Sequence, residues 1–243
     1  IKGIGAVPMG IGNKNLKWER TLSANLGLDL TMFKGRWDFS ADVYVKNTDN
    51  LLLDITKAPS LGITTSRENV GEVENHGFEF QTRVIPIKNK DWEWSLSLNY
   101  AYNKNKILNL GDGTEYIGSG NRRTAVGQQY NSFFMYKATG KFFNSQQEAD
   151  DYTAKYGNPF GRKFMAGDLI YEDTNGDGKL DSNDRIYTKH TDIPAITYGF
   201  NLGATWKNID LSMIWQGVGA VTHIYNREDL GEFSGDTRHP STL

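Results

Sequence analysis

The feature that most restricts the fold of this sequence is an alternation of apolar and polar residues with a period of two. Between residues 21 and 32 every second residue is apolar. Successive side chains of a β-strand point to opposite faces of the sheet, so this segment is predicted to be a strand with one dry and one wet face. Its apolar residues are Leu22, Ala24, Leu26, Leu28, Leu30 and Met32.

Five further segments alternate in a similar way. They cover residues 37–46, 78–84, 92–103, 198–206 and 209–215. No segment has the apolar spacing of a long amphipathic helix. The sequence therefore predicts an all-β, antiparallel, up-and-down architecture.

The connections between these strands fall into two classes. Tight hairpin turns are predicted at 34–36, 88–91 and 207–208. Long polar excursions are predicted at 54–72, at 104–196 and after Ala220. Short turns at one end of a sheet and long loops at the other are typical of a transmembrane β-barrel of the outer membrane.

This pattern divides the chain into four parts. Four barrel strands in two hairpins are predicted within 16–107, a long extracellular loop region within 108–194, a two-strand hairpin within 195–220, and the start of a further outer loop within 221–243. Residues 128–143 are aromatic but do not alternate strictly, so we expect a structured loop with some β character there.

Alternation alone does not say which face of the sheet looks outward. A lipocalin-like barrel turns its apolar face inward, whereas a porin-like barrel turns it toward lipid. Four tryptophans, Trp37, Trp92, Trp94 and Trp206, lie close to the short turns, where a girdle of aromatic rings would meet lipid headgroups. We therefore interpret the apolar face as lipid-facing, with a soluble barrel or sandwich as the alternative.

The composition excludes several other functions. With 27 Lys and Arg against 29 Asp and Glu, the chain lacks the basic surplus of a nucleic-acid-binding protein. It has no cysteine, and its four histidines are scattered, without an HExxH pair. Neither a GxSxG elbow nor a phosphate-binding loop is present. We do not expect an enzyme.

The sharpest local motif is an acidic loop at residues 173–184. Its spacing is that of a calcium-binding loop, with a glycine, Gly178, at position 6 for the sharp turn. Position 12 carries Asp instead of the usual Glu, and no clear helix flanks the loop. We expect structural Ca²⁺, and the alternative is a solvated turn. The candidate ligands are Asp173, Asn175, Asp177, the Lys179 carbonyl, Asp181 and Asp184.

Several segments resemble known proteins more specifically. Residues 69–80 (NVGEVENHGFEF) and 12–19 (GNKNLKWE) resemble strand-opening segments of TonB-dependent outer-membrane receptors. Residues 167–173 (GDLIYED), which run into the acidic loop, and residues 192–201 (DIPAITYGFN) are similar to the SusC/RagA branch of that family. The resemblance covers most of the chain, and its motifs come in the family's order.

The resemblance implies an active importer in the outer membrane of a Gram-negative cell. Such a protein has a barrel of about 22 strands with an N-terminal plug, is powered through the TonB complex and pairs with a SusD-like lipoprotein. Its cargo is implied to be an oligosaccharide or, in some members, a peptide. We expect this chain to be an interior part of the C-terminal half of the barrel, with the plug and the closing strand outside it.

Aromatic residues of the long loop are the candidates for contact with the substrate or the lipoprotein lid, because flat apolar rings with a polar rim suit sugar stacking. The alternative is that they pack the loop against itself. They are Tyr116, Tyr130, Phe133, Phe134 and Tyr136. For the whole protein, a passive porin and a soluble calcium-stabilised domain for carbohydrate binding or adhesion remain the alternatives.

Overall fold

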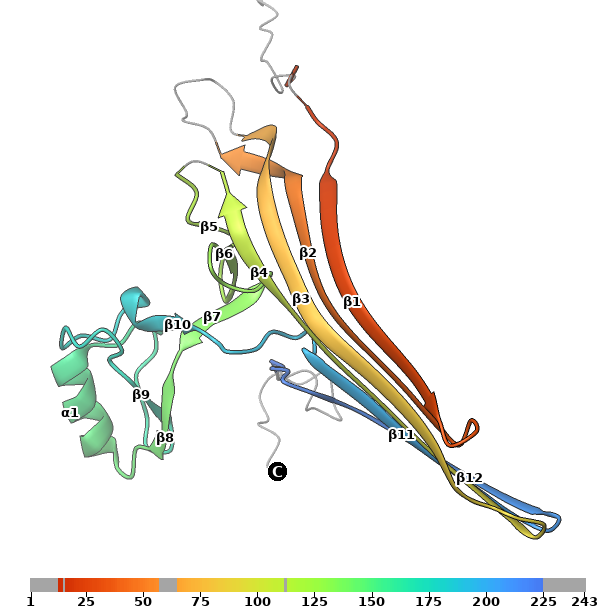
Figure 1. The fold of residues 1–243 in the computed structure, drawn as a ribbon. Coiled ribbons are helices and arrows are strands. Elements are labelled where there is room, and N and C mark those ends of the chain that lie inside the picture. Colours follow the sequence, from red (N-terminus) through yellow and green to blue (C-terminus); the bar gives the residue numbers. More distant parts are fainter. Residues whose placement is uncertain (1–12, 15, 57–64, 112, 225–243) are drawn as a thin grey trace, which may run out of the picture.

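The fold is a curved antiparallel sheet with a separate loop region at one end (Figure 1). A computed structural model describes residues 13–14, 16–56, 65–111 and 113–224. The six strands of the sheet lie in the order β1-β2-β3-β4-β11-β12. Their bounds are Arg20–Met32, Trp37–Thr56, Thr65–Lys88, Trp92–Leu110, Ile196–Trp206 and Ile209–Gly219. The predicted all-β, up-and-down architecture is confirmed.

The register joins the apolar positions of all six strands into continuous rows. One row consists of Leu30, Phe39, Thr82, Leu98, Phe200 and Trp215. In the described part of the chain, many side chains of this face are exposed: Leu26 is 78% exposed and its strand partner Val43 is 58% exposed. An apolar face of this extent needs a non-aqueous neighbour.

The opposite face is held by polar pairs across the strands. Asn25 donates to Asp42 over 3.1 Å, and Thr31 donates to Asp38 over 3.0 Å. This face carries the wet positions predicted from the alternation. In a barrel it faces the lumen.

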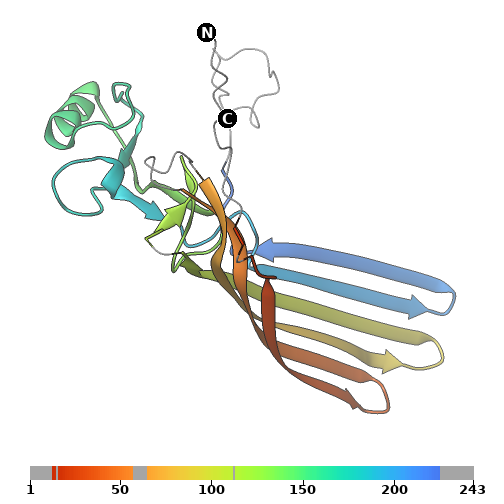
Figure 2. The ribbon, with the colours of Figure 1, turned by 90° about the horizontal axis from the view of Figure 1, so that it is seen from above.

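The three short turns lie together at one end of the sheet, and the loop region lies at the other (Figures 1 and 2). The predicted aromatic girdle residues are at the short-turn end, where Trp92 and Trp206 stack with ring centroids 5.6 Å apart. Trp37 stacks on Phe33 of the first turn with centroids 6.1 Å apart. The turn end is therefore the end with the aromatic belt.

Two predicted excursions are shorter than expected, because the strands continue into them. β2 extends to Thr56, β3 already begins at Thr65, and β4 ends only at Leu110. In these extensions, charged residues occupy the face that is apolar nearer the short turns. An example is Lys106, which pairs with Glu74. Strands that project beyond the bilayer have water on both sides, so they lose the alternation that marks a strand in the sequence.

The loop region, 111–195, is folded into small sheets and a helix. One sheet has the order β10-β7-β6-β5, and β8 pairs with β9. The strands are β5 Tyr116–Ile117, β6 Arg122–Ala125, β7 Ser132–Tyr136, β8 Ala138–Phe142, β9 Leu169–Tyr171 and β10 Arg185–Tyr187. The β character predicted for 128–143 is thus present in β7 and β8. The predicted outer loop beyond residue 220 lies outside the described residues from 225 onward.

Helix α1, Gln146–Tyr156, has no counterpart in the sequence prediction. Its signals are local: Ser145 caps it by accepting from the Glu148 N–H over 3.2 Å, and Gly157 ends it with φ 82°. Only Ala149 of the helix is buried, so it lacks the apolar stripe on which a periodicity search depends. No helix in the described part of the chain is long and apolar enough to cross a membrane.

Helix α1 covers a small hydrophobic core within the loop region. Its buried members are Phe143, Ala149, Phe164 and Leu180. Tyr152 packs edge-on against Phe143 and donates its hydroxyl to the Tyr171 carbonyl over 2.6 Å. The loop region therefore has a core of its own.

Candidate functional site

The loop region and the projecting ends of β2, β3 and β4 enclose an apolar pocket of about 470 Å³. Its floor includes Val73 and Ile107, which are directly paired between β3 and β4. By the register, this pair lies on the same face as Asp42 and Asn25, which is the lumenal face. The pocket is thus at the loop end of the barrel wall.

A glycine allows this floor to pack. A Cβ at Gly71 would lie 2.8 Å from Leu51 Cβ and 3.0 Å from Leu53 Cδ1. Leu51 and Leu53 therefore occupy the space that a side chain at position 71 would fill, and both line the pocket. Only glycine fits there without moving β2 away from β3.

The charged part of the pocket lining is a pair of arginines in β6. Arg122 lies 2.8 Å from the carboxylate of Asp192, and its guanidinium is 4.4 Å from the ring of Phe133. Arg123 has no carboxylate within ion-pair distance among the residues that the structure describes. Its Nε is buried without a hydrogen-bond acceptor.

Aromatic rings hold Arg123 in place. Its guanidinium carbon is 4.0 Å from the ring centroid of Tyr116 and 4.0 Å from that of Phe134. A second arginine, Arg185, lies 4.7 Å from the centroid of Phe134, and its Nε donates to the Phe134 carbonyl over 3.1 Å. Guanidinium groups stack well on aromatic faces, so these side chains form one ladder of alternating rings and cations.

The structure places the five predicted aromatic residues in different environments. Tyr116 and Tyr130 are 43% and 56% exposed, and Tyr130 lines the pocket. Phe133 is completely buried, whereas Phe134 and Tyr136 are partly buried within the ladder. Burial raises the pKa of the Tyr136 hydroxyl, although the nearby Arg185 opposes this shift. Tyr116 and Tyr130 are therefore the members with exposed ring surface.

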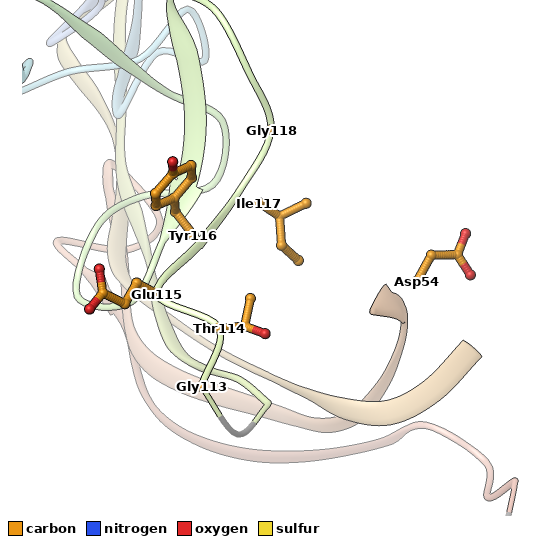
Figure 3. A pocket seen from close by; sticks show the side chains of 7 residues that line it. All are labelled: Asp54, Gly113, Thr114, Glu115, Tyr116, Ile117 and Gly118. Atoms are coloured by element: carbon orange, nitrogen blue, oxygen red, sulfur yellow. The ribbon is translucent and has the colours of Figure 1, made fainter. Parts of the chain in front are cut away.

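A second pocket, of about 510 Å³, adjoins the first and shares Ile117 and Gly118 with it. Figure 3 shows Asp54 on one side of this pocket, across from the loop that carries Thr114 and Glu115. Asp54 pairs with Arg67 over 2.9 Å. The charge of Asp54 is therefore already balanced, and Glu115 is the other acidic residue in the lining of the second pocket.

The acidic loop lies elsewhere, beside the core under α1. Asp173 accepts from the backbone N–H groups of Gly176 and Gly178 over 2.7 and 2.8 Å. Asp184 is fully buried and accepts from the N–H groups of Thr174 and Asp181, each over 2.8 Å. The loop therefore folds around its own carboxylates.

The remaining predicted ligands follow the same pattern. Asn175 accepts from the Asp177 N–H, and Asp177 accepts from the Lys179 N–H, each over 2.8 Å. Asp181 caps the short 3-10 helix Ser182–Asp184 by accepting from the Asn183 N–H over 2.7 Å. Within the described ranges, no three acidic or histidine side chains form a ready metal cluster.

Sequence reasoning missed the arginines of the ladder. The signal was present in the Arg122-Arg123 pair, which stands in a loop rich in glycine and polar residues. Nothing local shows, however, that this pair meets Phe134 and Arg185, because the contacts depend on how β6, β7 and β10 pair.

Comparisons with known proteins agree with this architecture. A family model described as "TonB dependent receptor-like, beta-barrel" matches residues 3–241. The chain is 31% identical to TonB-dependent receptor P26 of Formosa agariphila over 96% of this chain and 25% of that protein. It is 34% identical to TonB-dependent receptor SusC of Bacteroides thetaiotaomicron over 82% of this chain and 19% of SusC.

A solved structure of the RagAB peptide transporter superimposes with a TM-score of 0.65 at 25% identity, covering 86% of this chain and 22% of that one. The chain thus spans about a quarter or less of the length of these relatives. We expect part of such a barrel to be an antiparallel sheet with an exposed apolar face, with short turns at one end and long loops at the other. The six-stranded sheet has these features. The chain belongs to the TonB-dependent receptor family, as a SusC/RagA-like part of its outer-membrane β-barrel.

Proposed function

We propose that this chain is part of an active outer-membrane importer of large nutrients, either oligosaccharides or peptides, that is energised through the TonB complex. Membership of the family over residues 3–241 carries the proposal. It is further supported by the position of the apolar pocket at the loop end of the barrel wall, where an incoming nutrient first meets the barrel.

A SusD-like lipoprotein is the proposed partner at the outer mouth. The loop region offers it a folded surface with its own core, formed by α1 and the small sheets. A structured loop presents a fixed binding surface, whereas a flexible loop loses conformational entropy when it becomes ordered on binding. Co-purification of the lipoprotein from a detergent extract with the full-length receptor, and its loss when 138–184 is replaced by a short linker, would test this contact.

The import proposal is tested by uptake in cells. A strain that lacks the full-length receptor is complemented with it, and uptake of fluorescent oligosaccharides and peptides is measured with and without TonB. We expect uptake that requires both the receptor and TonB. Uptake that persists without TonB would instead indicate a passive porin. A receptor that stays in solution without detergent would indicate a soluble domain.

We also propose that the acidic loop binds structural Ca²⁺. The spacing of residues 173–184 supports this, because it is the spacing of the oxygen donors in a calcium-binding loop. Limited proteolysis with and without a chelator is the test. We expect faster cleavage within 173–184 after chelation, and identical digestion would contradict calcium binding.

A further inference from the structure

The apolar pocket combines two features that together define a ligand. Aliphatic side chains such as Leu51, Val73 and Ile107 line most of it, and its charged lining residues within the described part of the chain are both arginines. A volume of about 470 Å³ accommodates a large apolar side chain together with the backbone group that carries it. The pocket therefore suits a ligand with an apolar body and a negative charge.

Arg123 is the cation available to such a charge. Arg122 already faces Asp192 at 2.8 Å, whereas Arg123 has no carboxylate partner among the described residues. Its Nε is buried beneath the neighbouring rings, so the terminal N–H groups of its guanidinium are the donors that a ligand in the pocket would meet.

The ladder prepares Arg123 for this role. Contacts of 4.0 Å to Tyr116 and to Phe134 fix the plane of its guanidinium group before a ligand arrives. A fixed guanidinium fork matches a carboxylate with two parallel hydrogen bonds and loses little conformational freedom on binding. A lysine at this position would offer only a point charge.

The neighbouring acidic pocket distinguishes a peptide from an acidic sugar. A ligand that passes from Arg123 over Ile117 and Gly118 reaches the second pocket (Figure 3). Asp54 there already pairs with Arg67, so Glu115 is the acidic lining residue without an ion-pair partner among the described residues. A peptide carries negative and positive groups on one chain, whereas an oligosaccharide of uronic acids carries negative groups throughout and would be repelled from the second pocket. An aliphatic lining also suits a peptide side chain better than a hydroxylated ring.

We propose that Arg123 binds the C-terminal carboxylate of a peptide whose last, apolar side chain enters the pocket formed by β2, β3, β4 and the loop region. This inference rests on the proposed import function and narrows its cargo. The exposed rings of Tyr116 and Tyr130 flank the ligand, and Glu115 in the second pocket receives a basic group further along the peptide.

The test uses the full-length receptor in detergent and fluorescent peptides that end in leucine, either as the free acid or as the C-terminal amide. Binding is measured by fluorescence anisotropy. We expect the free acid to bind about tenfold to a hundredfold more tightly than the amide, because a charge-assisted hydrogen bond is lost in the amide. Equal Kd values for the two peptides in the unaltered receptor would overturn the inference without any mutation.

Two variants and a control locate the effect. Arg123→Gln should abolish the preference for the free acid, and Arg123→Lys should retain only part of it. Arg162→Gln is the matched control, since Arg162 pairs with Asp168 in the same loop region but does not line the pocket. A preference that survives in Arg123→Gln would show that another group, for example one from the rest of the protein, reads the carboxylate, and would overturn the assignment.

Uptake separates this inference from the import function. TonB-dependent uptake of both peptide forms at equal rates overturns the inference and leaves import intact. TonB-dependent uptake of an acidic oligosaccharide but of no peptide does the same. Absence of TonB-dependent uptake for every compound overturns both.

Discussion

The buried carboxylate of Asp184 accepts a 2.8 Å hydrogen bond from the backbone N–H of Thr174, which closes the acidic loop at its two ends. The same carboxylate also accepts from the Asp181 N–H over 2.8 Å. The Thr174 hydroxyl returns a hydrogen bond to the Asp184 carbonyl over 3.0 Å. This residue is therefore the centre around which the loop folds, whether or not a cation is present.

Replacing Asp184 by alanine should open the loop. The change leaves the N–H groups of Thr174 and Asp181 without an acceptor in a buried site, which costs about 1–3 kcal/mol of local stability. Hydrogen–deuterium exchange should show faster exchange in 173–184, with little change in β1–β4. Asp151→Ala is the control, because Asp151 lies on the exposed face of α1. Unchanged protection in Asp184→Ala would contradict this role.

The same carboxylate should make the loop sensitive to acid. Burial alone would raise the pKa of Asp184, but hydrogen bonds from the backbone N–H groups of Asp181, Thr174 and Asn175 hold the pKa below its ordinary value. The stabilisation is thus fully present above the unfolded pKa of about 3.9 and is lost as the pH falls through the lower folded pKa. Pepsin should begin to cleave 173–184 only below about pH 4. Cleavage that sets in well above that pH would show that a different group controls the loop.

The ring of Tyr44 lies over Gly77, its direct partner in β3, and leaves no room for a side chain there. A Cβ at Gly77 would clash with the Tyr102 carbonyl oxygen and lie 2.7 Å from the Tyr44 hydroxyl. Gly77→Ala should therefore cost about 1–3 kcal/mol in the free energy of unfolding, measured by urea denaturation of the full-length barrel. Gly219→Ala is the control, since its Cβ would meet Ile196 at an ordinary 3.6 Å. Equal denaturation midpoints would refute the close contact.

The membrane-crossing part of the sheet could be predicted from the sequence because lipid on one side and water on the other impose a strict period of two. Leu26, Val43 and Phe78 were placed on one face by alternation, and the register puts them side by side. Above the membrane that asymmetry disappears. The sequence therefore predicts a loop over 54–72, although β2 continues to Thr56 and β3 begins at Thr65.

The candidate site could be predicted only in part. Exposed aromatic residues such as Tyr116 and Tyr130 stand out in a loop sequence, but their environment depends on long-range pairing. Arg123 contacts Phe134 because β6 pairs with β7. The sequence near these residues does not indicate that the two strands pair. Helix α1 was missed for a related reason: its contact with the core rests on a few residues instead of an apolar stripe.

The exposed apolar face of the sheet meets lipid, and the polar face looks into the lumen. The 243-residue sequence contains no cysteine, so a single introduced cysteine is the only residue of this part of the receptor that a thiol-reactive fluorophore would label. Leu26→Cys and Asn25→Cys, adjacent in β1 and on opposite faces, are labelled with a fluorophore in the full-length receptor in vesicles. We predict that spin-labelled lipid acyl chains quench the fluorophore at position 26 and not at position 25. Quenching at position 25 but not at position 26 would mean that the polar face meets lipid and the apolar face does not.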